Sequence, residues 1–164
     1  MKKLTVLSLL ILLLNCQKKH EHLKRVGEPD VVFFDDSDSD MNNAVDLAKR
    51  TFPEFEKAIL SDNLDYSNFT LKQRFATDDG NGEHIWIREI EYEDGRYFGI
   101  VDNVPVSLKQ IQVEDTIEVS KKDISDWMYY DKNIVKGAYT VKVLRKQMSP
   151  EEKRIMDAEG LIYE

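Results

Sequence analysis

The chain has 164 residues, which is enough for about one domain with a single core, and 41% hydrophobic with 33% charged residues is the composition of an ordinary globular protein. Its formal net charge is −8. Because affinity for phosphate backbones needs clustered Lys and Arg, this charge argues against a nucleic-acid partner.

Residues 1–15 have the pattern of an export signal. Lys2 and Lys3 give a positive start, Leu4 to Leu14 form an apolar run, and Cys16 follows Asn15. The run is too short to cross a bilayer, which takes about 20 apolar residues. Its Leu-Leu-Asn-Cys ending resembles a bacterial lipoprotein signal, which implies lipidation of Cys16 as the first residue of the mature chain. An ordinary signal cut elsewhere and an uncleaved anchor are the alternatives.

Residues 16–29 are predicted to be a flexible, lipid-anchored tether, because they are polar and have no sustained period. His20 and His22 lie there without a third ligand nearby, so we expect no metal site and no cofactor. Gln17 stands where an aspartate would resemble a retention signal. We therefore expect an exported envelope lipoprotein, on the outer membrane facing the periplasm if the host is Gram-negative, with residues 30–164 forming a single domain.

The acidic stretch at 35–40 predicts the start of a helix. Carboxylates stabilise a helix N-terminus, and Ser39 or Asp40 can cap it. A calcium-binding EF-hand loop is excluded, because Met41 stands where the loop needs Gly and Leu47 where it needs a bidentate Glu.

The helix that follows is predicted to be amphipathic and to face the core, with Pro53 kinking it or restarting it under a Thr51 cap. Its apolar residues recur at steps of four and three: Met41, Val45, Ala48, Phe52, Phe55 and Ile59.

From Tyr66 to Leu144 the hydrophobic period changes to two, which predicts strands. In the first strand Phe69, Leu71 and Phe75 share one side. In the second, the residues on one face are His84, Trp86, Arg88, Ile90 and Tyr92, and those on the other are Ile85 and Ile87.

Asp94-Gly95 predicts a two-residue hairpin turn that sets Glu93 opposite Arg96 and Tyr92 opposite Tyr97. Further strands are expected in the runs at 116–120, 124–130 and 138–144.

A last helix is predicted to begin at Ser149, where a cap, a proline and a capping-box glutamate occur together, and to stop at Gly160. The predicted fold class is therefore α+β. An N-terminal amphipathic helix would pack on a small, strongly bent antiparallel sheet or partial barrel, with a short C-terminal helix.

Several short motifs, in this order and spacing, resemble the bacterial YegJ-like family, domain-of-unknown-function family 2314, over roughly residues 31–145. They are Ala44 with Phe55 on the helix, His84-Ile85-Trp86, Phe98-Gly99, Asn103-Val104-Pro105, Glu114-Asp115, Ile124-Ser125-Asp126-Trp127 and Gly137-Ala138-Tyr139-Thr140. Glu114 departs from the glycine that this family tends to have. The resemblance implies a compact α+β domain and no activity, because none is assigned to the family.

Six residues of these motifs are the candidates for a binding or structural site: His84, Trp86, Asn103, Asp126, Trp127 and Tyr139. A hydrolase would need a nucleophile such as Ser107, Ser125 or Thr140 with His84 as base and an acid from Asp79, Asp115 or Asp126, yet none of these lies in a recognisable catalytic motif.

The aromatic residues, among them Tyr129 and Tyr130, either fill the core or form a binding surface. We predict a non-catalytic protein- or ligand-binding module held at the membrane through Cys16, with an envelope protein as the candidate partner and no catalytic residue assigned. The alternatives are a hydrolase using His84 with an acidic residue, and an immunity-type inhibitor of a toxin.

Overall fold

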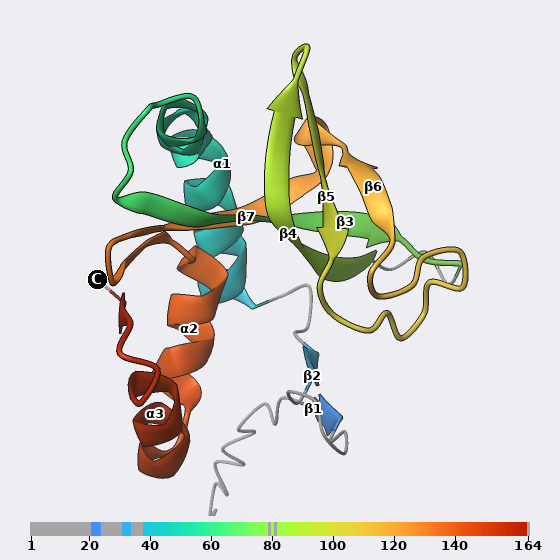
Figure 1. The fold of residues 1–164 in the computed structure, drawn as a ribbon. Coiled ribbons are helices and arrows are strands. Elements are labelled where there is room, and N and C mark those ends of the chain that lie inside the picture. The colour runs from blue at the N-terminus through green and yellow to red at the C-terminus, as the bar shows by residue number, and fades with distance from the viewer. Residues whose placement is uncertain (1–20, 24–30, 34–37, 79, 81, 164) are drawn as a thin grey trace, which may run out of the picture. The chain divides into compact units, whose positions relative to one another are not determined.

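The structure is a computed structural model that describes residues 21–23, 31–33 and 38–163, except 79 and 81. The chain divides into two compact units, residues 1–36 and 37–164, and each is described by itself. Figure 1 shows the elements of both units.

In the first unit two short strands pair antiparallel. Strand β1 (Glu21–Leu23) lies within the stretch predicted to be a tether, and it pairs with β2 (Val31–Phe33). The predicted signal segment, Cys16 and the rest of the predicted tether lie outside the described residues.

The second unit begins with helix α1 (Ser39–Ile59). Its N-cap is Asp38, whose side chain accepts hydrogen bonds from the backbone N–H groups of Asp40 and Met41 at 3.0 and 3.1 Å. The acidic stretch does start a helix as predicted, but Asp38 takes the capping position expected for Ser39 or Asp40. Asp38 is favoured there because its extended backbone aims the carboxylate at two free N–H groups.

Helix α1 continues through Pro53, so the predicted restart is wrong. Thr51 does not cap a new helix, because its hydroxyl donates to the Leu47 carbonyl at 2.8 Å. Pro53 is exposed, so the carbonyl that lacks its N–H partner can meet water. The buried face consists of Ala44, Ala48, Phe52, Phe55 and Ala58, while Met41, Val45 and Ile59 of the predicted stripe are half-buried.

Seven strands form one open, mixed sheet in the order β6-β5-β4-β3-β7-β8-β9. Their bounds are β3 Tyr66–Ala76, β4 Gly82–Glu93, β5 Arg96–Val101, β6 Thr116–Val119, β7 Ile124–Asp131, β8 Ile134–Gly137 and β9 Ile162–Tyr163. Neighbours pair antiparallel except β8 and β9, which run parallel. The predicted α+β class is confirmed, and the parallel pair makes the sheet mixed where an antiparallel one was expected.

The β4–β5 hairpin has the predicted turn. Asp94 and Gly95 both have positive φ, at 49° and 82°, and the register pairs Glu93 with Arg96 and Tyr92 with Tyr97. This confirms the hairpin predicted from two residues.

A β-bulge in β4 corrects the predicted face of Ile90. Glu89 has a φ of 52°, and the register with β5 shifts between Arg88 and Glu91. The extra residue turns Ile90 to the buried side that Ile85 and Ile87 occupy. A strict period of two cannot reveal such an insertion, because it places every second residue on one face.

Residues 138–144, predicted as a strand, belong instead to helix α2 (Tyr139–Gln147). Gly137 and Ala138 have φ values of 73° and 53°, and this left-handed pair ends β8 and turns the chain into the helix. The alternation of apolar residues in a run this short fits either element.

Helix α3 (Pro150–Asp157) has the predicted Ser149 cap and capping box with Glu152. It ends three residues before the predicted stop at Gly160, with Ala158 as its C-cap. A single turn of 3₁₀ helix, η1 (Lys121–Asp123), precedes β7.

The core lies between α1 and the sheet, and Figure 1 shows α1 running behind β7. Trp127 of β7 is 1% exposed and donates its indole N–H to the Ala48 carbonyl at 2.9 Å. Phe55 packs against the Trp127 ring with 5.9 Å between centroids. None of the helices in the described part of the chain is long and apolar enough to cross a membrane.

Candidate functional site

A polar group of side chains lies on the face of the sheet opposite to the one that carries the core residues of β3, β4 and β7. Lys72 of β3 is the register partner of Trp86 on β4 and of Asp126 on β7. The next position along β3, Leu71, pairs with the core residues Ile87 and Trp127. Since side chains alternate between the two faces of a strand, Lys72, Trp86 and Asp126 share the opposite face.

Asp126 of β7 is fully buried, and its side chain caps the N-terminus of α2. Its carboxylate accepts from the backbone N–H groups of Trp127, Tyr139 and Thr140 at 2.8, 3.2 and 2.8 Å, and from the Thr140 hydroxyl at 2.6 Å. The N-cap residue, Ala138, has no side-chain acceptor to offer. Asp126 therefore satisfies the free N–H groups of the helix start that a local Ser or Asp usually binds.

Burial raises the pKa of the Asp126 carboxyl, and the hydrogen bonds from Thr140, the charge of Lys72 and the Trp127 N–H act against this rise. Burial lowers the pKa of Lys72, against the attraction of Asp126. Each shift disfavours the charged form, as expected where water is excluded. Groups with shifted pKa values often mark functional sites, although structural networks produce them as well.

The Lys72 ammonium is enclosed although part of its side chain remains accessible. Its Nζ donates to the Thr140 hydroxyl at 3.2 Å and lies 5.1 Å from the centroid of the Trp86 ring. The ammonium thus contacts an aromatic face on one side and a hydroxyl on another.

His84 is exposed along part of its ring, while its Nδ1 lies 2.7 Å from the hydroxyl of Ser125. The Ser125 hydroxyl also lies 3.2 Å from the Lys72 carbonyl, to which it can only donate. Burial of the inner edge of the ring, together with the positive charges of Lys72, Arg74 and Lys49, lowers the pKa of His84 to about 4. The ring is therefore neutral at pH 7.

Asn103 has a backbone-pairing role. Its side-chain oxygen accepts from the Trp86 N–H at 2.7 Å, and the Asp102 N–H donates to the Trp86 carbonyl at 2.9 Å. These two bonds tie the loop after β5 to β4 beside the polar face. Asn103 thus contacts the backbone of Trp86, and its hydrogen bond does not involve the Trp86 ring.

The six sequence candidates divide between the two faces of the sheet. His84, Trp86 and Asp126 belong to the polar face, while Trp127 lies in the core. Tyr139 joins the two sides, because its N–H donates to Asp126 and its ring packs edge-on against Trp127 with 5.7 Å between centroids.

Of the candidate nucleophiles and acids, Ser107 and Asp115 are exposed, whereas Ser125, Thr140 and Asp126 are closed to solvent. Ser125 is 2% exposed, Thr140 is 1% exposed and Asp126 is 0% exposed. His84 and Trp86 remain at least partly accessible. The arrangement can present an imidazole and an indole to a ligand, and the two hydroxyls that the structure places beside them, those of Ser125 and Thr140, are buried, which disfavours covalent chemistry through them.

Lys72 and Arg74 were missed as candidates by sequence reasoning. The chain holds 23 Lys and Arg residues, and no motif distinguishes a lysine that becomes buried from those that face water. Alternation along β3 does place the two on one face. No group of three or more His, Cys, Asp and Glu in the described residues is arranged to hold a metal ion.

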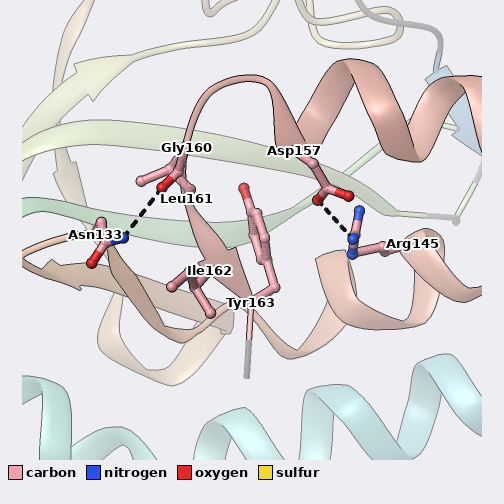
Figure 2. A pocket seen from close by; sticks show the side chains of 7 residues that line it. All are labelled: Asn133, Arg145, Asp157, Gly160, Leu161, Ile162 and Tyr163. Atoms are coloured by element: carbon pink, nitrogen blue, oxygen red, sulfur yellow. Dashed lines mark hydrogen bonds and ion pairs between the residues drawn. The ribbon is translucent and has the colours of Figure 1, made fainter.

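A pocket forms elsewhere, between α2, the end of α3, β9 and the turn that precedes β8, as Figure 2 shows. Arg145 pairs with Asp157 across it at 2.7 Å, and the Asn133 side chain donates to the Gly160 carbonyl at 3.4 Å. Its other lining residues are Leu161, Ile162 and Tyr163. None of the six sequence candidates lines this pocket.

Comparison with known proteins connects the chain to bacterial proteins without an assigned function. Residues 38–163 match the family described as "Uncharacterized protein conserved in bacteria (DUF2314)". This match begins a few residues later than the resemblance in the sequence motifs and extends further, through α3 and β9.

Two relatives have similar sequences. A "Putative ankyrin repeat protein" of Neisseria meningitidis serogroup B is 32% identical over 143 residues, covering 81% of this chain and 55% of the relative, so the chain spans about half of that protein. The "Uncharacterized protein YegJ" of Escherichia coli K12 is 29% identical over 112 residues, covering 68% of this chain and 71% of the relative. No solved structure matches.

Proposed function

Because the chain belongs to the DUF2314 family of uncharacterised bacterial proteins, we propose a function from its own residues: a cell-envelope lipoprotein whose folded domain is a non-catalytic binding module. The proposal has two parts, the anchor at Cys16 and the binding surface on the polar face of the sheet. The two parts rest on different residues and are tested separately.

The anchor is supported by the order of residues at the N-terminus. A basic start, an apolar run of secretory length and the only cysteine follow one another, and no second cysteine exists to make Cys16 a disulfide partner. Gln17 after the cysteine favours the outer membrane, facing the periplasm, in a Gram-negative host. An acyl anchor on Cys16 would hold the domain near the membrane surface.

The binding part rests on one observation: an imidazole, an indole and the exposed Arg74 are accessible on the polar face, whereas the hydroxyl and carboxyl groups of Ser125, Thr140 and Asp126 beside them are buried. The Asp126 carboxylate accepts hydrogen bonds from the start of α2 and from the Trp127 N–H, so it is committed to the fold. Ser125 is 2% exposed and out of a substrate's reach. These positions favour recognition over the hydrolase alternative.

Metabolic labelling with palmitate tests the anchor. The wild-type chain should incorporate label and fractionate with membranes, while Cys16→Ser should remain unlabelled and accumulate as precursor or in soluble fractions. Equal labelling of both chains would exclude a lipid on Cys16.

Co-purification from solubilised membranes tests the binding part. The wild-type chain and a Trp86→Ala variant of equal thermal stability are compared, with Leu64→Ala as the matched control because Leu64 is 100% exposed. A stoichiometric partner should be retained by wild type and Leu64→Ala and lost from Trp86→Ala. A partner retained equally by all three chains would show that binding occurs elsewhere.

A further inference from the structure

Positive charge gathers around His84 in a protein that is acidic as a whole. Arg74 is the direct register partner of His84, and Lys72 is the partner of Trp86 two residues further along β4. The charge of Lys49 on α1 also contributes, to a lesser extent, to lowering the pKa of His84. Three cations from two elements thus act on one neutral side chain, although the formal net charge of the chain is −8.

These three cations have no carboxylate within ion-pair distance among the described residues. Other cations of the same sheet do: Arg88 pairs with Glu114 at 2.7 Å, and Arg96 pairs with Glu118 at 3.6 Å. The cations around His84 therefore keep a positive potential that is neutralised elsewhere on the sheet.

Within the described part of the chain, Lys72 has more hydrogen-bond donors than the acceptors that the structure places around it. Its enclosed ammonium has three N–H donors, and Thr140 accepts from it at 3.2 Å. Asp126, the carboxylate whose charge acts on it, already accepts four hydrogen bonds from other groups. Buried donors with remaining capacity usually bind water or an ion.

We propose that the positions of Lys72, Arg74 and Lys49 around His84 form a binding site for an oxyanion group, a phosphate or carboxylate carried by the ligand of this module. The inference rests on the proposed binding function and specifies its ligand chemistry. Arg74 and Lys49 supply exposed charge that attracts the anion, and Lys72 supplies a donor against which Trp86 closes one side. The neutral imidazole of His84 stands at the centre and gains a proton more readily once an anion is beside it.

The imidazole of His84 is a built-in reporter for this site. The chain contains three histidines, His20, His22 and His84, so a histidine-labelled full-length chain in detergent gives a simple NMR spectrum. The signal of His84 is identified by its loss in His84→Gln. Its titration is then followed in sodium phosphate, in sodium acetate and in sodium chloride at equal ionic strength.

Phosphate or acetate should raise the His84 titration midpoint by about 1 pH unit relative to chloride, because a bound anion stabilises imidazolium. Whichever of the two probes acts identifies the group as phosphate or carboxylate. Arg74→Gln should weaken the affinity for that probe about tenfold, the loss typical of one charge-assisted contact. Arg96→Gln is the matched control, because Arg96 is also a strand arginine and lies at the far end of β4–β5.

Three results would overturn the inference: no shift with either oxyanion, equal shifts in chloride, or equal losses in Arg74→Gln and Arg96→Gln. Thermal melts of both variants verify that they fold, which is expected because both arginines are exposed. A membrane partner that Trp86→Ala loses and Arg74→Gln keeps would leave the binding module standing without an oxyanion site. If no partner is found but the His84 titration shifts with an oxyanion, the oxyanion site stands and the proposed binding of a membrane partner does not.

Discussion

Asp126 shows how one side chain connects distant elements. It lies on β7, yet its carboxylate caps α2, and its Oδ2 accepts from both the N–H and the hydroxyl of Thr140. The sequence suggested Asp126 as a candidate because it stands beside Trp127 in a family motif. Its capping role was not predictable, because the residues that it caps were expected to form a strand.

Asp126→Asn should destabilise the fold by about 2 to 4 kcal/mol, since an amide can place an N–H against the Thr140 N–H and leave buried donors unpaired. Asp131→Asn on the same strand is the control and should stay within about 0.5 kcal/mol of wild type. The measurement is urea unfolding of both variants. Equal midpoints for the two would show that the Asp126 bonds contribute nothing.

His84 should make stability depend on pH. Its pKa is about 4 in the folded chain and near the ordinary value of 6.5 when unfolded, so between these values the unfolded chain binds more protons. Stability from this group is complete above about pH 6.5 and falls as pH decreases toward about 4. Because carboxylates titrate alike in both proteins, the stability of His84→Gln relative to wild type isolates the effect.

Unfolding curves of wild type and His84→Gln at about pH 7 and about pH 4.5 test this dependence. The variant should gain on wild type at the lower pH. A stability difference that is the same at both values would mean that the ring is as accessible to protons in the folded chain as in the unfolded one.

At the scale of elements, turn chemistry was predictable and bulges were not. Asp94-Gly95 identified its hairpin because few residues accept positive φ at two successive positions. Glu89 and Glu114 also have positive φ, at 52° and 72°, but glutamate gives no such signal. At Glu114, where the resembling family tends to have glycine, an ion pair with Arg88 at 2.7 Å accompanies the left-handed backbone.

The β8–α2 junction needs a glycine at position 137 for two reasons: the positive φ of the backbone and the lack of space for a Cβ atom. Gly137 and Gly160 have φ values of 73° and 76°, but a Cβ at Gly137 would overlap the carbonyl and ring of Trp127, while one at Gly160 would meet open space. Gly160→Ala should therefore cost about 1 kcal/mol, and Gly137→Ala about 2 kcal/mol or more beyond that.

Thermal or urea unfolding of the two glycine variants is the measurement, with Gly160→Ala as the built-in control for backbone strain. Equal costs would show that the Trp127 side of the junction relaxes freely to admit a methyl group.

At the scale of the whole molecule, the α+β class followed from the change of hydrophobic period along the chain, from a helical stripe before Ile59 to alternation after Tyr66. The parallel strand β9 did not. It consists of Ile162 and Tyr163 only, and the Ile162 N–H reaches the Asn133 carbonyl at 2.8 Å. A pairing this short has no periodicity of its own, and only the path of α3 brings it to the sheet.

The candidate site was predictable only in part, because a sequence shows alternation within one strand but not the pairing between strands. His84 and Trp86 share a face by simple alternation, and the sequence placed them together. Their neighbours Lys72 and Arg74 come from the adjacent strand, and register between strands cannot be read from one of them alone. Trp127 was a candidate for a binding or structural site, and its 1% exposure places it in the core.

The claim that the polar face is where this module binds its ligand is tested most directly by a photo-crosslinking amino acid placed at position 86 in living cells. The matched control places it at position 64, because Leu64 is 100% exposed and distant in sequence from β4. A discrete adduct at position 86 and none at position 64, with the Arg74→Gln substitution reducing it, is the predicted result. No adduct at position 86, or the same adducts from both positions, would contradict the account.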